Sequence, residues 1–395
     1  MKQPIVVLGA GIYQMGLIQK SQKLGYYVHV LSRAGNYPGI KIADEFHEID
    51  TTDRYGVLEF CQRIKPKFVV TSGSDVCMPA IGMVNEVLGL PGVKSAAAET
   101  MSTKTRFREF ESKHGLECPV FFTSREVEDA WERFRACNSD MLLKPSMASG
   151  SRGISRVAQG IHKDEFVRLY EVASKNSLSR EVCCEAFLPG KEIGGNAILK
   201  NGKCAFIAIS RKHLDGFIVT GHEYPSDLSN AQRQNVIDVL ENCVNKLAYS
   251  DGPLNFDMMI DGSSARIIEP CARFGGNGLV VLCKRAFGVD LEMNMLRSFL
   301  GLELDLQSTA QQHCGSYVFG SDRTGVLTGM ASVDELRRSC PWVISIETQR
   351  HIGDCVDKMK SNADLIGYVI FDIPKGMTWD LCVSEVKNHL QLELA

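Results

Sequence analysis

Apolar and polar positions follow different patterns in different parts of the chain. Near the start, short apolar runs at residues 5–8, 27–31 and 68–71 are separated by segments of helical character. Strands that alternate with helices in this way predict βαβ units and a parallel sheet. After a helical segment at residues 163–175, apolar runs follow one another with only short breaks. Such a succession of strands predicts an antiparallel sheet.

These patterns predict an α/β protein with an added α+β part. At 395 residues the chain exceeds the size at which a single core keeps growing, so several domains are expected. The alternation of strands and helices breaks around Pro91 and Gly92, which indicates a domain edge. We expect a doubly wound α/β domain at residues 1–95, a central domain at 96–303 and a small α+β domain at 304–395.

Charge and cysteine usage narrow the class of protein. The chain has 44 basic and 47 acidic residues, for a formal net charge of -3, which argues against nucleic acid or a membrane surface as a partner. Its 14 cysteines include no CxxC pair, so neither a zinc cluster nor a disulfide scaffold is indicated. The sequence has no run of about 18 apolar residues. We therefore expect a soluble, cytoplasmic protein with reduced thiols.

The segment from residue 254 to 278 carries two acids in a predicted β-hairpin. Asp257 lies on the first apolar run, Glu269 ends the second, and Arg273 follows. Side chains alternate faces along a strand, so the two acids point the same way only with an odd loop or a β-bulge, and we expect that register. Neighbouring carboxylates repel, and Mg²⁺ takes oxygen ligands, so the pair suggests a Mg-nucleotide site. A hairpin with its acids in water is the alternative.

The loop that follows Lys144 is a candidate phosphate site. Residues 145–153 are rich in small side chains. A loop with accessible backbone N–H groups can fold over phosphates, and Lys144 and Arg152 would supply positive charge. The spacing differs from that of the Walker P-loop, GxxxxGK[ST]. A mobile hairpin tip is the alternative interpretation.

Other candidate residues flank the predicted strands. Residues 185–188 offer an extended backbone that can bond an adenine edge, and Glu192 could accept hydrogen bonds from ribose hydroxyls. Asp75 follows a strand at the end where open parallel sheets bind ligands, although a helix cap is the commoner role for Asp there. Arg211 and His222 border a loop-like segment that we expect to contact substrate. A structural role is the alternative for a single His.

With these motifs in order, the chain resembles the ATP-grasp superfamily, carboxylate-amine ligase type, over nearly its whole length. Residues 1–95 resemble the domain that precedes the ATP-grasp domain, and the tail resembles the small closing domain of biotin carboxylase and amino-acid ligases. The resemblance implies metal binding by Asp257 and Glu269, and catalysis by Arg273 and Lys144, with Arg273 also facing the substrate. It implies nucleotide contacts from Lys104, Lys144, Ser151, Arg152, Gly153, Glu185, Ala186, Phe187, Leu188 and Glu192.

One position departs from the family's pattern. The usual ending is Glu-x-Asn-x-Arg, whereas this chain has Cys271 between Glu269 and Arg273. A thiol is a poor ligand for Mg²⁺, so a second metal ion would be held differently or by water. Among the relatives, amino-acid and dipeptide ligases look most tolerant of this change, which favours amide formation.

The resemblance implies an ADP-forming ligase that uses ATP with Mg²⁺ or Mn²⁺. A substrate carboxylate would attack the γ-phosphate, and an amine would displace phosphate from the acyl phosphate to give an amide. The expected partners are a small carboxylate and a small amine, without nucleic acid or membrane, and a homodimer is compatible with the resemblance. Two alternatives stay open: activation of bicarbonate as carboxyphosphate, and a non-catalytic nucleotide-binding protein.

Overall fold

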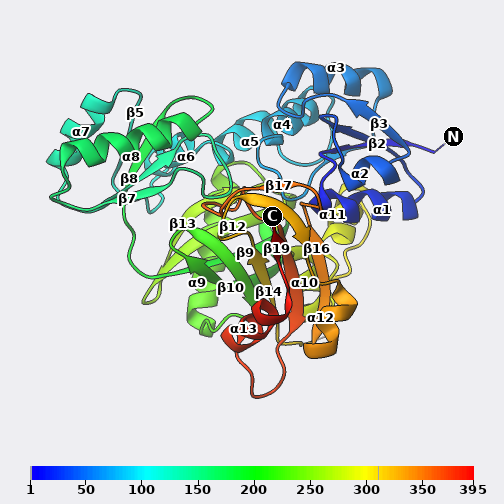
Figure 1. Ribbon diagram of the computed structural model, residues 1–395. Coiled ribbons are helices and arrows are strands. Elements are labelled where there is room, and N and C mark those ends of the chain that lie inside the picture. The colour runs from blue at the N-terminus through cyan, green and yellow to red at the C-terminus, as the bar shows by residue number, and fades with distance from the viewer. Residues whose placement is uncertain (1, 310) are drawn as a thin grey trace.

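The computed structural model describes residues 2–309 and 311–395, and the chain begins with a four-stranded parallel sheet in the order β3-β2-β1-β4 (Figure 1). At its centre, residues 5–8 are fully buried, as an apolar run in a parallel strand predicts. The predicted parallel α/β start is confirmed. The elements are β1 (Pro4–Leu8), η1 (Ile12–Gln14), α1 (Met15–Lys23), β2 (Tyr27–Ser32), α2 (Pro38–Ile42), β3 (Glu45–Glu48), α3 (Arg54–Ile64), β4 (Val69–Val70), α4 (Met78–Val87) and α5 (Ser95–Met101).

A small lobe at residues 121–186 stands apart from the rest of the molecule (Figure 1, cyan to green). Its four-stranded sheet has the order β5-β8-β6-β7, and a core that includes Phe122, Phe134 and Phe166 joins the sheet to two helices. Helix α6 leads into it from the parallel-sheet domain. The elements are α6 (Lys104–Lys113), β5 (Phe121–Ser124), α7 (Val127–Ala136), β6 (Met141–Pro145), β7 (Ser155–Val157), α8 (Lys163–Asn176) and β8 (Val182–Ala186).

The predicted succession of antiparallel strands forms the larger part of an eight-stranded sheet. The strand order is β13-β12-β9-β10-β11-β14-β18-β16, and we refer to it as the large sheet. Alternating burial along β12 gives it one buried face and one face open to the neighbouring small lobe. The elements are β9 (Lys191–Lys200), β10 (Lys203–Asp215), β11 (Ile218–Tyr224), α9 (Asn230–Lys246), β12 (Gly252–Asp261), β13 (Ser264–Cys271), α10 (Leu279–Phe287) and α11 (Leu291–Phe299).

The last part of the chain extends the large sheet and adds a small unit. Strands β14, β18 and β16 continue the large sheet beyond β11, while β17, β15 and β19 form a separate three-stranded sheet. The domain boundaries given above stay predictions. Among the described residues, no helix has the length and apolar character needed to cross a bilayer. The elements are β14 (Cys314–Phe319), β15 (Gly325–Gly329), α12 (Val333–Ser339), β16 (Val343–Thr348), β17 (Cys355–Val356), β18 (Gly367–Asp372), α13 (Trp379–His389) and β19 (Glu393–Leu394).

The hairpin of β12 and β13 has the expected register. Asp257 pairs directly with Glu269, and a β-bulge follows, since the next partner of Met258 is Ile267. The two strands are joined through Gly262, whose φ of 58° lies in the left-handed region that favours glycine. Both acids therefore lie on one face of the large sheet, next to the small lobe.

Candidate active site

A cavity of about 90 Å³ lies between the small lobe and the large sheet. The small lobe contributes Lys144 and Glu185 to its wall, and the large sheet contributes Glu192, Lys212 and Asp257. The cavity thus places charged groups from two sheets opposite each other. Its apolar lining consists of Leu142, Ile154, Phe187, Leu188, Phe217, Met259 and Ile268.

Two carboxylates and two lysines form one end of this cavity. Lys212 Nζ lies 2.8 Å from Asp257 Oδ2 and also contacts Glu192, while Lys104 Nζ lies 3.1 Å from Glu269 Oε2. Burial, assisted by the charges of Glu192 and Glu269, raises the pKa of Asp257 to about 6 although Lys212 opposes the change. Burial also disfavours ionisation of Glu269, but Lys104 and the other lysines outweigh it and lower the pKa of Glu269 to about 2. Glu269 therefore stays charged down to low pH, whereas Asp257 takes up a proton as the pH falls through about 6.

Lys144 is held at the cavity wall by a buried ion-pair chain. Its ammonium contacts Glu185, and Glu185 accepts a 2.8 Å hydrogen bond from Arg108 Nε. Arg108 also donates to the carbonyl oxygens of Ile267 and Ile268 on β13, at 3.1 and 2.8 Å. Burial opposes ionisation of Glu185, yet the two cations hold its pKa at about 2. The chain of contacts fixes α6 and the small lobe against the hairpin that carries the acids.

The glycine loop, residues 149–153, covers part of the cavity. Ser149, Gly150 and Ser151 line it, whereas Arg152 is exposed and its Nε donates to the Ser149 carbonyl at 3.0 Å. The carbonyl of Gly150 accepts a 3.0 Å hydrogen bond from the backbone of Asn362. The structure therefore brings the loop to the predicted site, docked against the C-terminal part of the chain, with Arg152 pointing along the loop rather than into the cavity.

The strand end at Glu185 to Leu188 forms the apolar side of the cavity. Phe187 and Leu188 line it, and the backbone N–H groups of Ala186 and Phe187 donate to Val120 and Asp140 carbonyls at 2.8 and 3.0 Å. These two bonds fix the backbone of the segment. The result is a rigid, apolar wall of the kind that accepts a flat ring.

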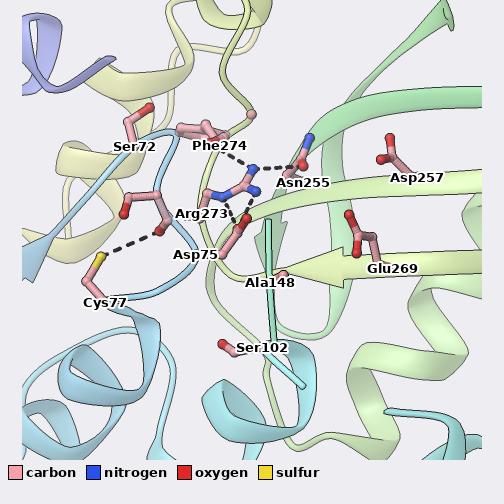
Figure 2. A network of polar contacts seen from close by, with 12 residues as sticks. Ser72, Asp75, Cys77, Ser102, Ala148, Asn255, Asp257, Glu269, Arg273 and Phe274 are labelled. Atoms are coloured by element: carbon pink, nitrogen blue, oxygen red, sulfur yellow. Dashed lines mark hydrogen bonds and ion pairs between the residues drawn. The ribbon is translucent and has the colours of Figure 1, made fainter. Parts of the chain in front are cut away.

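Arg273 lines a second, adjoining cavity of about 30 Å³. Figure 2 shows the polar contacts of Arg273. Its guanidinium donates to Asp75 Oδ1 at 2.6 Å and to Asn255 Oδ1 at 2.8 Å, and it also reaches the Phe274 carbonyl at 3.2 Å. Asp75 comes from the parallel-sheet domain, while Asn255 lies on β12 two residues before Asp257. Two separate segments, together with the carbonyl of the next residue, therefore orient one arginine. Both cavities are lined by Lys104, Ile268 and Glu269.

Cys271 also lines the second cavity and is cross-strand partner of Asn255. Burial raises the pKa of its thiol well above the usual range, so the sulfur stays protonated at neutral pH. A buried neutral thiol is neither a ready nucleophile nor a ligand for a hard cation. Its cross-strand partner Asn255 carries an amide, but both ends of that amide are already hydrogen-bonded. The oxygen accepts from Arg273, and the nitrogen donates to the Gly195 carbonyl.

Two predicted substrate residues lie elsewhere. Among the described residues, Arg211 and His222 line neither cavity: Arg211 approaches Glu223 at 4.0 Å, and His222 is buried with its Nδ1 3.0 Å from Ser210 Oγ. Burial lowers the pKa of His222 to about 3, so its ring is neutral. Sequence reasoning missed Lys212, the neighbour of Arg211 on the opposite face of β10. Because β10 continues through Lys212 to Asp215, side chains alternate between its two faces, and this alternation would have placed Lys212 on the face opposite to Arg211.

The sequence is similar to a known domain family and to several known proteins. Residues 101–277 match the model of the ATP-grasp domain family. The chain is 22% identical over 390 residues to the uncharacterized protein y4rH of Sinorhizobium fredii, covering 93% of this chain and 80% of that protein. It is 22% identical over 274 residues to an alanine–anticapsin ligase of Bacillus subtilis, covering 63% of this chain and 58% of that ligase.

Solved structures share the fold across the whole chain. An L-amino acid ligase from Bacillus licheniformis has a TM-score of 0.81 at 17% identity, covering 100% of this chain and 99% of that one. The biotin carboxylase domain of a 2-oxoglutarate carboxylase from Hydrogenobacter thermophilus, a dimer with MgADP and bicarbonate, has a TM-score of 0.73 at 17% identity, covering 100% and 91%.

Residues 101–277 therefore contain an ATP-grasp domain, as the motifs indicated. The architecture around that domain, with a parallel α/β sheet before it and α+β elements after it, is also as predicted.

Proposed function

We propose that this protein is an ATP-dependent ligase that activates a carboxylate as an acyl phosphate and joins it to an amine, releasing ADP and phosphate. The observation that carries the proposal is the adjoining pair of cavities with Lys104 and Glu269 on their common wall. With nucleotide in the apolar pocket on one side and substrate at Arg273 on the other, a phosphoryl acceptor would lie next to a phosphoryl donor.

We propose one orientation for ATP along the first cavity. Phe187 and Leu188 offer the apolar wall for adenine, and Glu192 is close enough on β9 to accept from ribose hydroxyls. Lys144 and the glycine loop lie nearer the charged end, where they would contact phosphate oxygens. The γ-phosphate then points toward the two carboxylates.

The acids at that end suit Mg²⁺ or Mn²⁺. Asp257 and Glu269 present hard oxygen donors from paired strand positions, and each now balances its charge with a lysine, which a cation can replace. A bound Mg²⁺ would neutralise charge on the β- and γ-phosphates. Lys104 and Lys212 would turn from the acids toward phosphate oxygens.

Most of the proposed chemistry requires positioning rather than covalent participation by the protein. A substrate carboxylate oxygen forms a bond to the γ-phosphorus while the bond to the β-phosphate oxygen breaks and ADP leaves. The amine then attacks the acyl carbon, phosphate departs, and the nitrogen loses a proton to give the amide. Arg273, oriented by Asp75 and Asn255, would bind the carboxylate and stabilise the oxyanion. The docked glycine loop would keep water from the acyl phosphate.

The test is turnover with a defined set of acids and amines. Purified protein is incubated with ATP, Mg²⁺ and pooled amino acids, and nucleotides, phosphate and amides are measured by chromatography and mass spectrometry. We expect ADP, phosphate and amide in equal amounts, no turnover in Glu269→Gln, and normal turnover in the exposed-site control Glu171→Gln. AMP with pyrophosphate as main products, or full activity of Glu269→Gln, would overturn the proposal.

Bicarbonate is a second candidate for the acid. The cavity at Arg273, about 30 Å³, holds about two waters, which is closer to the size of bicarbonate than to that of an amino acid. ATP hydrolysis that is stimulated by bicarbonate and indifferent to every amino acid would favour this alternative. Stimulation by amino acids alone would favour amide formation.

We further propose a cytoplasmic setting and a homodimer. A soluble pool of ATP and small acids suits such an enzyme, and 13 of the 14 cysteines are at least partly covered, in keeping with reduced thiols. Light scattering after gel filtration tests the oligomeric state, with a mass near 43.7 kDa contradicting the dimer.

A further inference from the structure

The parallel-sheet domain carries a cluster of metal-ligating side chains that the proposed ligase chemistry does not use. His29 lies on β2, and Glu45 and His47 lie on the neighbouring edge strand β3. His29 and Glu45 are direct register partners, and His47 follows two residues later, so all three side chains lie on the same face of the sheet. None of the three lines the cavities of the candidate active site.

The three side chains meet at distances typical of a coordination shell. His29 Nδ1 is 3.0 Å from His47 Nε2, Glu45 Oε2 is 3.5 Å from His29 Nδ1, and Glu45 Oε1 is 3.5 Å from His47 Nε2. Bond lengths of about 2.0–2.1 Å around a tetrahedral ion separate its ligand atoms by about 3.3 Å. A hydrogen bond between two imidazoles requires only the two rings. The Glu45 carboxylate adds oxygen ligands, with one of its oxygens 3.5 Å from each imidazole nitrogen.

The ligand atoms are held in place before any ion binds. The ring of Phe60 on α3 lies 4.3 Å from the His47 ring and 5.7 Å from the His29 ring, centroid to centroid, and the Tyr27 ring lies 5.0 Å from His29. His29 is buried, whereas the Glu45 side chain is 49% exposed. In the metal-free protein one of the two imidazole nitrogens donates to the other at 3.0 Å, and a change of tautomer would present both lone pairs to an ion. An ion can enter from the Glu45 side and keep a water there.

We propose that His29, Glu45 and His47 form a binding site for one divalent transition-metal ion of the Zn²⁺ class. Two imidazole nitrogens and one carboxylate oxygen suit Zn²⁺, Co²⁺ or Ni²⁺, whereas Mg²⁺ prefers oxygen ligands only. The bound ion fastens the four-residue edge strand β3 to β2, which stabilises the parallel-sheet domain. This inference is independent of the proposed ligase activity.

The test uses the full-length chain with Cys355, the exposed thiol among the described cysteines, changed to Ser. Chelator-treated protein is titrated with Co²⁺ and with Zn²⁺ in excess Mg²⁺, following visible absorption and the thermal midpoint. We expect one equivalent of Co²⁺ with tetrahedral absorption bands and no thiolate-to-metal band. Zn²⁺ should raise the thermal midpoint.

Substitutions separate this site from other binding on the protein surface. Glu45→Gln replaces the charged carboxylate by a neutral amide, and His47→Gln removes an imidazole nitrogen. Affinity should fall by at least about tenfold to a hundredfold, the effect that the loss of an outer-shell partner alone causes, and the thermal response should shrink accordingly. The control His351→Gln alters an exposed His elsewhere and should bind as well as the parent protein. Far-UV circular dichroism verifies folding, and exposed Glu45 keeps the test valid if the His47 variant is unstable. Absence of a bound equivalent, unchanged affinity in Glu45→Gln, or a thiolate band would overturn the proposal.

Discussion

Replacing Glu185 by Gln should destabilise the fold strongly, because this carboxylate is the charge partner of buried Lys144 and one of two buried partners of Arg108, the other being Glu111. Glu185, Lys144 and Arg108 are 2%, 4% and 1% exposed. Burial opposes ionisation of Glu185, yet the two cations lower its pKa from 4.5 to about 2. This change corresponds to about 3 kcal/mol in favour of the charged form. Removing one member of a buried ion pair costs about 3–5 kcal/mol. Glutamine keeps the shape but leaves Lys144 without its charge partner.

The measurement is urea unfolding followed by far-UV circular dichroism at pH 7. With a slope of about 3 kcal/mol per molar, the midpoint should fall by about 1–2 M. The control Glu171→Gln removes an exposed helical pair with Lys175 and should change stability by less than about 0.5 kcal/mol. Equal midpoints for Glu185→Gln and the control would refute the argument that the buried chain of charges fixes the small lobe.

Three further predictions concern the charged end of the cleft. Arg273→Ala should lower kcat by about a hundredfold to a thousandfold while ATP affinity, measured by calorimetry, stays within about threefold, because the guanidinium acts where charge develops. Asp257 has a raised pKa of about 6, so it binds a proton below that pH; Mg²⁺ affinity should be constant above pH 6 and fall about tenfold per pH unit below it in metal titrations. Lys212→Met should move this pH midpoint upward, whereas Arg211→Met, on the opposite face of β10, should leave it unchanged.

The elements with a strong local signal were predictable from the sequence. The apolar runs near residues 5–8 and 27–31 became buried parallel strands, and the Asp-Gly turn gave the hairpin that pairs Asp257 with Glu269. The register was expected, and of the two ways to reach it, an odd loop or a β-bulge, the protein uses the bulge. Local residue chemistry decides these features, so a single sequence contains them.

Features that depend on distant contacts were harder to predict. A predicted break near residue 211 placed Lys212 in a loop, whereas β10 continues because β9 and β11 pair with it on both sides. Arg108 lies on the charged helix α6, where side chains usually face water, yet it is buried against Glu185 and two β13 carbonyls. Strands β14, β18 and β16 likewise join the large sheet through pairing that no local pattern encodes.

The central claim is that a substrate carboxylate attacks the γ-phosphate of ATP, and oxygen transfer tests it most directly. The protein is supplied with unlabelled ATP, Mg²⁺ and amino acids that carry ¹⁸O in both carboxylate oxygens, and the released phosphate is analysed by mass spectrometry. Formation and aminolysis of an acyl phosphate predict one ¹⁸O atom in each phosphate released with an amide. Amide formation accompanied by unlabelled phosphate, or by labelled AMP, would contradict the account.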